Sequence, residues 1–201
     1  MKEKIVEQAT ELFIKLGFKS VTMDDIANEM GISKKTIYLH FKNKTELVEE
    51  STLQLFNKIV DGIQCIRDQH KNPIEELYDI KKMVMVFLHN ERASTEYQLQ
   101  KYYPKIFSCL RSKQFETMQS CVLENLKKGV GEGIYRENLN MDFISRIYFS
   151  GITSLKNQAL FPTEPFPIKT LMEDYLEYHL RGIVTPKGRT ILNTLINSNH
   201  E

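Results

Sequence analysis

A lysine-rich segment near the start of the chain has the residue types needed to bind a polyanion. Residues 31–44 contain four lysines and no acidic residue, whereas the other residues of the first 50 contain four lysines and nine acidic residues. Ammonium groups gathered in this way can neutralise the phosphates of a nucleic-acid backbone. The formal net charge of the whole chain is only +1, so the prediction of a nucleic-acid partner depends on this local concentration. A solvated face without a partner is the alternative explanation of these lysines.

Three signals for the start of a helix lie within and beside this segment. Thr22 and Asp25 have the spacing of a capping box. Ser33 marks a second start, and Asn43 with Glu46 marks a third. The helices between these signals must be short, which is costly because helix nucleation is unfavourable. A helix of about eight residues is ~12 Å long, and the DNA major groove is about 12 Å wide, so the predicted length suits insertion into that groove.

The residues between these signals have the spacing of a helix-turn-helix. Ala27 is small enough for two helices to cross closely, and Gly31 can adopt the positive φ of a sharp turn. The shared core is expected to consist of four apolar residues, Ile26, Met30, Ile32 and Ile37. We therefore predict helices at residues 2–16, 23–30 and 34–41, the last being the recognition helix. A helical corner without a DNA-binding role has the same spacing and is the alternative.

The segment "TMDDIANEMGISKKTIYLHFKNKTEL", residues 22–47, resembles the TetR family of bacterial transcriptional regulators. The resemblance includes the preceding "IVEQATELFIKLGF", extends over roughly residues 1–50 without gaps, and is most specific in "TIYLHFKNKTEL". It implies a homodimeric regulator, commonly a repressor, that binds a near-palindromic operator on double-stranded DNA. It also implies that a small-molecule effector releases the protein from that operator.

The resemblance further implies which side chains contact DNA. It places residues 34–41 in the major groove, and Ser33 lies on the same exposed side. The residues expected at base edges are Lys34, Lys35, Thr36 and Leu39. The residues expected at phosphates are Thr22, Tyr38, His40 and Lys44. Phe41 is expected in the core instead.

The remainder of the chain shows helical periodicity and no strand signal. Further helices are expected near residues 44–68, 74–92, 105–128, 141–161, 168–184 and 188–197, with prolines between them or near their starts. The predicted fold class is therefore all-α, with about nine helices. Helices lengthen after residue 43, which predicts a small N-terminal domain at residues 1–48 and a larger helical domain at residues 49–201. The resemblance implies that the first is the helix-turn-helix DNA-binding domain and that the second binds the effector and forms the dimer.

Two apolar stripes at helical spacing predict a dimer interface. The first stripe contains Ile144, Ile147, Tyr148, Gly151, Ile152 and Leu155. The second contains Leu171, Met172, Tyr175, Leu176, His179 and Ile183. Two such helices from each subunit would form a four-helix interface. Burial inside one subunit is the alternative for both stripes.

The region between about residues 50 and 140 is expected to hold the effector. In the family, ligand binding there shifts the long helix that begins near Lys44, which changes the separation of the two recognition helices. The candidate lining residues combine apolar surface with a few polar groups, and they are Phe87, Tyr102, Tyr103, Phe107, Gln114 and Met118. Ordinary core packing is the simpler alternative for each of them. A second alternative is a C-terminal domain that docks a protein partner or only dimerises.

Other classes of function lack support in the sequence. The three cysteines, Cys65, Cys109 and Cys121, are odd in number and widely spaced, which fits a reducing cytoplasm. No His-Glu-x-x-His pair occurs, so neither a metal site nor a cofactor is predicted. A helical enzyme would need a nucleophile beside a base, and no such pair is apparent. The apolar runs are too short for a membrane span of about 20 residues, so we expect a cytoplasmic protein with no membrane partner.

Overall fold

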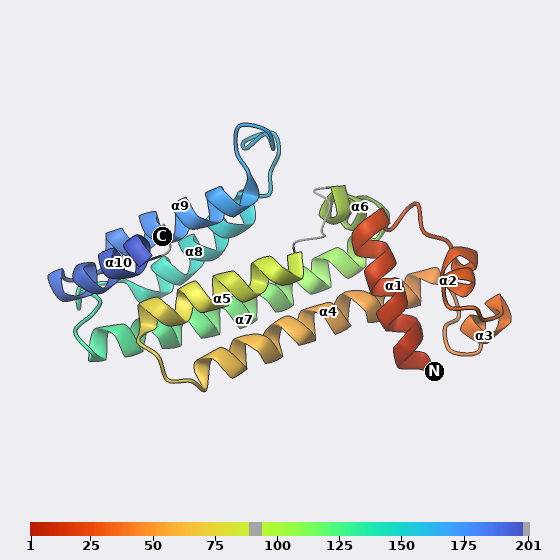
Figure 1. The fold of residues 1–201 in the computed structure, drawn as a ribbon, viewed down its shortest axis with the longest axis horizontal. Helices are drawn as coiled ribbons and strands as arrows, with labels where there is room; N and C mark the ends of the chain where they lie inside the picture. Colours follow the sequence, from red (N-terminus) through yellow and green to blue (C-terminus); the bar gives the residue numbers. More distant parts are fainter. Residues whose placement is uncertain (89–93, 199–201) are drawn as a thin grey trace. The chain divides into compact units, whose positions relative to one another are not determined.

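The computed structural model describes residues 1–88 and 94–198, and this part of the chain is helical (Figure 1). The ten helices of the described part are α1 (Lys2–Leu16), α2 (Met23–Glu29), α3 (Lys34–Tyr38), α4 (Lys44–Arg67), α5 (Pro73–Leu88), α6 (Ser94–Tyr102), α7 (Pro104–Gly131), α8 (Met141–Ser154), α9 (Ile168–Ile183) and α10 (Pro186–Ser198). The predicted all-α fold class is confirmed.

Two helices, α3 and α8, end at least three residues before their predicted ends within the part of the chain that the structure describes. Helix α3 stops at Tyr38 rather than residue 41, because its last turn tightens: the His40 amide donates to the Ile37 carbonyl three residues back. Helix α8 stops at Ser154 rather than residue 161, and the Asn157 side chain beyond it accepts from a backbone amide in a local turn that competes with helix.

Helix α6 was absent from the prediction. Its inward side consists of Thr95 and Leu99, both 4% exposed, and two residues are too few to produce a periodic signal. The predicted helix at residues 74–92 corresponds to α5, and its last residues, 89–92, lie outside the described part of the chain.

The described chain packs as two compact units. Unit 1 is drawn from residues 1–61 and 87–114, and unit 2 from residues 62–86 and 115–201. Helices α4 and α7 are continuous and contribute residues to both units. The predicted division after residue 48 follows the DNA-binding motif rather than packing, and it stays a prediction.

The core of unit 1 holds the first three helices together. Helix α1 contacts α2, and α2 contacts α3 (Figure 1). Four of its side chains, Ile5, Phe13, Ile26 and Ile37, are at most 1% exposed. Phe41 is also 1% exposed, as expected for a core residue. Each short helix is thus stabilised by burial of its apolar side chains rather than by its own length.

The core of unit 2 contains a buried hydrogen-bond network as well as apolar side chains. The Asn125 amide donates to the Pro73 carbonyl and to Glu76 Oε1, both at 2.9 Å. The Tyr135 hydroxyl donates to Asn125 Oδ1 at 3.1 Å. Because all three polar side chains are at most 5% exposed, these bonds fix the start of α5 against α7.

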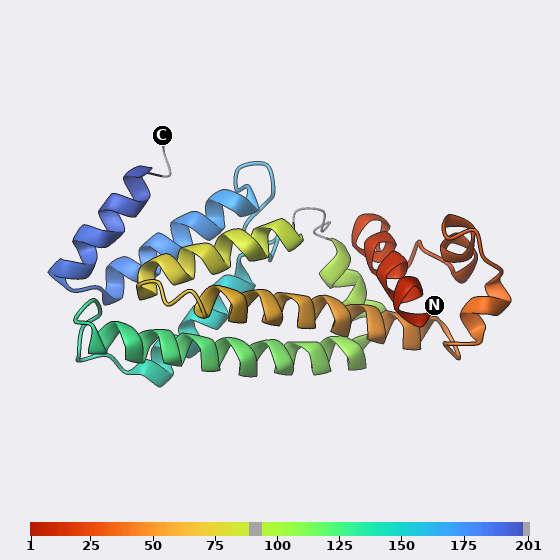
Figure 2. The ribbon, with the colours of Figure 1, turned by 60° about the horizontal axis from the view of Figure 1, so that its bottom comes forward.

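Helices α8 and α9 contact each other in unit 2 and lie side by side in Figure 1, and Figure 2 shows the same chain after a turn of 60°. The Tyr175 hydroxyl of α9 donates to the backbone carbonyl of Ile147 in α8, at 3.0 Å. A Cβ placed on Gly151 would come within 2.1 Å of that hydroxyl, so glycine is needed for the close approach of the two helices. His179 is 8% exposed, and its ring centroid lies 4.6 Å from that of Tyr148.

The buried His179 is expected to make the protein less stable in mild acid. Burial lowers the pKa of His179 to about 4, whereas the unfolded chain binds this proton near pH 6.5. Between about pH 6.5 and about pH 4 the histidine is therefore protonated in the unfolded state but not in the folded state. The free energy of unfolding falls as the pH drops through this range. The cost at the acid end is about 3 kcal/mol.

The measurement is the free energy of unfolding in urea at several pH values for the wild type and for His179→Gln. Titrating carboxylates contribute to both proteins, so the difference between them isolates the histidine. We expect the gap between the two stabilities to change by about 3 kcal/mol across this window. A gap that stays constant with pH would show that the histidine is protonated in the folded protein.

Candidate nucleic-acid interface

The start of α2 is fixed by the capping box that the sequence predicted. The Asp25 amide donates to Thr22 Oγ1 at 3.1 Å, and the Thr22 amide donates to Asp25 Oδ2 at 2.7 Å. The hydrogen bonds from the Thr22 backbone and side chain hold the pKa of Asp25 below its usual value. Thr22 is exposed at the N-terminus of the helix, where the free amides and the helix dipole favour an anion.

The turn between α2 and α3 depends on a glycine. Gly31 has a φ of +62°, in the left-handed region that other residues adopt at a cost. A Cβ at this position would meet no atom within 4 Å, so the backbone angle, rather than lack of space, is what requires glycine. The Ile32 amide donates to the Ala27 carbonyl at 3.0 Å, which closes the turn.

Helix α3 presents polar side chains outward from one buried anchor. The Ser33 hydroxyl accepts from the Thr36 amide at 3.1 Å and lies 2.9 Å from the Thr36 hydroxyl, so the helix start is capped. Ile37 is fully buried and anchors the helix to the core, whereas Tyr38 is 45% and Leu39 75% exposed. A 75% exposed leucine is costly in water, and it can recover that cost against a thymine methyl group.

The structure places the nine predicted DNA-binding residues at the helix-turn-helix and the start of α4. Six of them are exposed, namely Thr22, Ser33, Lys34, Lys35, Tyr38 and Leu39. The other three are half-buried, namely Thr36, His40 and Lys44. The third predicted start is also present, since the Glu46 amide donates to Asn43 Oδ1 at 3.0 Å.

Lys44 has a structural partner that the sequence did not predict. Its ammonium donates to the backbone carbonyl of Phe18, and burial lowers the pKa of Lys44. An ammonium has three hydrogens, so a phosphate contact remains possible beside this bond.

Lys34 is also engaged within the protein. Its Nζ lies 2.6 Å from Oδ2 of Asp24 in α2, and both side chains are about half exposed, at 46% and 59%. This hydrogen bond raises the pKa of Lys34. In the part of the chain that the structure describes, the ammonium groups of Lys35 and Lys42 have neither a hydrogen bond nor an ion pair. Of the four lysines in residues 31–44, Lys34 and Lys44 therefore have partners within the protein, whereas Lys35 and Lys42 are free cations.

The six predicted effector residues are distributed over the two units. Tyr103 and Phe107 pack against the core of unit 1, and Met118 packs against the core of unit 2. Tyr102 is 41% exposed, and the other two, Phe87 and Gln114, are half-buried.

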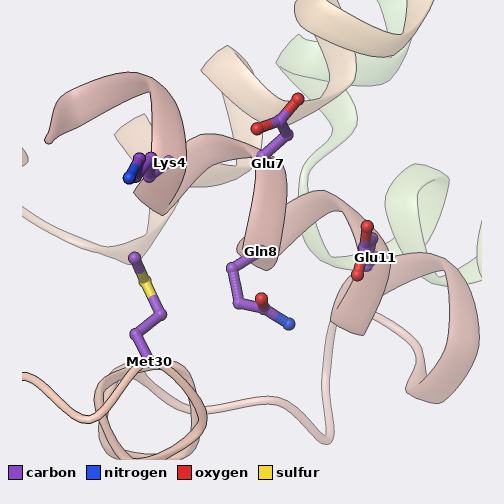
Figure 3. Close-up of a pocket in the computed structure, with 5 residues that line it drawn as sticks. All are labelled: Lys4, Glu7, Gln8, Glu11 and Met30. Atoms are coloured by element: carbon purple, nitrogen blue, oxygen red, sulfur yellow. The ribbon is translucent and has the colours of Figure 1, made fainter.

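A pocket of unit 1 is lined by other residues (Figure 3). It has a volume of about 320 Å³, and its lining consists of Lys4, Glu7, Gln8, Glu11 and Met30. Four of its five lining residues come from α1 and none is a predicted effector residue. Polar and charged side chains dominate the lining, which is unlike a typical small-molecule site.

Most of the predicted dimer residues are covered within the protomer. Seven are at most 9% exposed, namely Tyr148, Leu155, Leu171, Met172, Leu176, His179 and Ile183. Four are half-buried, namely Ile144, Gly151, Ile152 and Tyr175. Ile147 is 47% exposed, and it is accompanied by two residues absent from the prediction, Phe143 at 56% and Tyr178 at 77%. Phe143 lies four residues before Ile147 and Tyr178 three residues after Tyr175, so helical spacing is compatible with both, and the sequence prediction missed them.

Two further kinds of functional feature are absent from the part of the chain that the structure describes. Over residues 1–88 and 94–198, no group of three or more His, Cys, Asp or Glu side chains could hold a metal ion. No helix in the same ranges is long and apolar enough to cross a bilayer.

Comparison with known proteins identifies relatives over most of the chain. The profile of "Bacterial regulatory proteins, tetR family" matches residues 5–51. The HTH-type transcriptional repressor KstR2 of Mycolicibacterium smegmatis is 24% identical over 196 residues, which cover 93% of this chain and 92% of KstR2. IcaR of Staphylococcus aureus, a negative transcriptional regulator of the biofilm operon icaADBC, is 26% identical over 166 residues, which cover 80% of this chain and 89% of IcaR.

A solved structure extends the similarity to the fold. The complex of SmeT with triclosan has a TM-score of 0.66 at 17% identity and covers 92% of both chains. SmeT represses the multidrug efflux pump SmeDEF of Stenotrophomonas maltophilia. The two chains therefore share a fold over nearly their whole length.

Proposed function

We propose that this chain, whose residues 5–51 match the TetR family of bacterial regulatory proteins, is a homodimeric DNA-binding repressor whose α3 enters the major groove of an operator. The single observation that carries the proposal is that α3 presents Lys35, Tyr38 and Leu39 to solvent. The helix is capped at its start, follows a turn at a glycine, and is anchored to the core by the buried Ile37. Residues 1–48 would form the DNA-binding domain and residues 49–201 the effector-binding and dimerisation domain. The family consists of regulators rather than enzymes.

The proposal is tested by genome-wide capture of DNA bound to the intact protein, followed by binding to the captured sequences in vitro. A dimer would place two recognition helices one or more DNA turns apart, about 34 Å for each turn. We therefore expect near-palindromic sequences with half-sites about 10 base pairs apart, or a multiple of that spacing. A protein that binds no duplex at low ionic strength would refute the proposal.

The proposed dimer would use α8 and α9, where Phe143, Ile147 and Tyr178 are exposed. Their apolar surface is costly in water, and covering it by the same face of a second subunit is favourable. Since most other stripe residues are buried within the protomer, these exposed side chains would supply the greater part of the contact.

Ile147→Asp is expected to weaken dimerisation at least about tenfold, because it buries a charge at an apolar interface. The measurement is the dimer dissociation constant from sedimentation equilibrium. Val86→Asp is the matched control, since Val86 is 75% exposed on α5 and lies outside the proposed face. Equal dissociation constants for the two variants would remove α8 from the interface.

An apolar small molecule is the proposed effector. The similar protein SmeT forms a complex with triclosan, and KstR2 of Mycobacterium tuberculosis is described as a ketosteroid transcriptional regulator. Triclosan and ketosteroids are both apolar molecules with a few polar groups, which suits the mixture of Phe87, Tyr103 and Gln114 among the candidate residues.

A C-terminal domain that docks a protein or only dimerises is the second candidate. The observation that favours it is the packing of Tyr103, Phe107 and Met118 against the cores of their units. Thermal unfolding with a panel of apolar compounds separates the two candidates. A compound that raises the melting temperature and also releases captured DNA supports an effector site.

A further inference from the structure

Asp24 brings a negative charge to the surface that we propose faces DNA. It lies in the first turn of α2, and 59% of its side chain is exposed. Phosphates repel an exposed carboxylate, so a carboxylate here weakens DNA binding unless it has another role. Its partner is Lys34 of α3, ten residues later in the chain, at 2.6 Å.

We propose that Asp24 is a specificity-determining residue, which holds the ammonium of Lys34 so that this lysine does not take part in sequence-independent phosphate binding. The inference rests on the proposed placement of α3 in the major groove. It assigns different roles to the two adjacent lysines: Lys35 is a free cation, and Lys34 is a cation held by α2.

The physical basis is the difference between a paired and a free ammonium. Non-specific affinity arises when free cations replace counterions along the phosphate backbone, and each contact adds about 0.9 to the salt slope. An ammonium that is already neutralised by a carboxylate has little to gain from a single screened phosphate. Lys34 in its pair therefore adds little to the affinity for random sequence.

A base edge offers Lys34 a better exchange. The N7 and O6 atoms of guanine provide two acceptors at fixed positions, whereas an exposed ion pair is worth only about a factor of 1.4 to 5 in an equilibrium constant. The pair is thus weak enough to open for a correctly placed guanine. Asp24 thereby lowers the affinity for all other sequences more than the affinity for the operator.

The experiment measures binding of a 20-base-pair random-sequence duplex by fluorescence anisotropy at several salt concentrations. The proteins are the intact wild type, Asp24→Asn, Lys34→Ala and the double variant. We expect Asp24→Asn to steepen the slope of log K against log salt by about 0.9 and to tighten binding several-fold at low salt. We expect Lys34→Ala alone to leave the slope unchanged, and Asp24→Asn to lose its effect when Lys34 is alanine.

Glu29→Gln is the matched control for the loss of one negative charge. Glu29 is exposed at the other end of α2, and its change alters the net charge equally without freeing Lys34. If Asp24→Asn and Glu29→Gln have the same effect, or if Asp24→Asn acts equally without Lys34, the inference is wrong. A flatter slope for Lys34→Ala alone would also overturn it.

The same measurements separate this inference from the proposed function. If the wild type binds no duplex at low salt, the proposed interface itself is wrong. If the wild type binds and the four proteins have one slope, only the role of Asp24 is wrong. On captured DNA, Asp24→Asn is expected to tighten binding less than on random sequence, so the ratio of the two affinities should fall.

Discussion

Replacing Lys35 with alanine is expected to weaken binding to captured operator DNA about 5- to 150-fold, corresponding to about 1–3 kcal/mol for one lost base contact. The reason is that Lys35 is exposed on α3 and its ammonium has no partner in the described part of the chain, so it is free to donate to a guanine. The loss on a random duplex should be smaller, because there Lys35 as a free cation gives up only one screened phosphate contact and no base contact. The measurement is anisotropy with both duplexes at one salt concentration.

Tyr38→Ala provides the contrast to this variant. Tyr38 is 45% exposed beside the recognition residues, and its hydroxyl is proposed to contact a phosphate, which carries no sequence information. We therefore expect similar losses on the captured and random duplexes. If both variants lose affinity equally on both duplexes, the proposed division between base and phosphate contacts is wrong.

Replacing Gly129 with alanine is expected to destabilise the protein by about 3 kcal/mol or more. A Cβ at this position would lie 2.1 Å from the ring of Tyr135, and that side chain is fully buried. The ring cannot move aside freely, because its hydroxyl donates to Asn125. Overpacking costs about 1–3 kcal/mol, and an acceptor left without its donor costs about 1–3 kcal/mol more.

Gly131→Ala is the control for this second variant, because Gly131 belongs to the same helix and a Cβ there would meet nothing within 4 Å. It should be neutral or stabilising by up to about 1 kcal/mol, since alanine favours helix over glycine. Urea denaturation gives both values. If the two variants have equal midpoints, the contact between Gly129 and Tyr135 does not constrain the core.

The features that were predicted correctly from the sequence are those that depend on local interactions. The capping box of Thr22 and Asp25 and the turn at Gly31 each depend on backbone and side-chain atoms within a few residues. Short sequence motifs are sufficient to identify such local interactions, so the helix-turn-helix and the all-α class could be predicted. The ends of α3 and α8 could not, because a tightened turn and an Asn157 turn compete with helix by small energies.

The stripes of α8 and α9 show a second limit. Periodicity identifies the apolar side of a helix but not the surface that covers it, because burial inside a protomer and burial between protomers require the same residue types. The structure covers Tyr148 and Leu176 within one protomer and leaves Phe143 and Tyr178 exposed. Helix α6 shows a further limit of periodicity, because a helix with only two inward residues produces too weak a periodic pattern to be recognised.

The sequence by itself determined the short capped helices, the glycine turn and the concentration of lysines in residues 31–44. Only the tertiary structure decided which of those lysines are free. Asp24 reaches Lys34 because α2 packs against α3, and the Phe18 carbonyl reaches Lys44 because the chain folds back onto the start of α4. The charge of a segment is a property of its composition, whereas its availability to a partner depends on neighbours that only folding brings within hydrogen-bond distance.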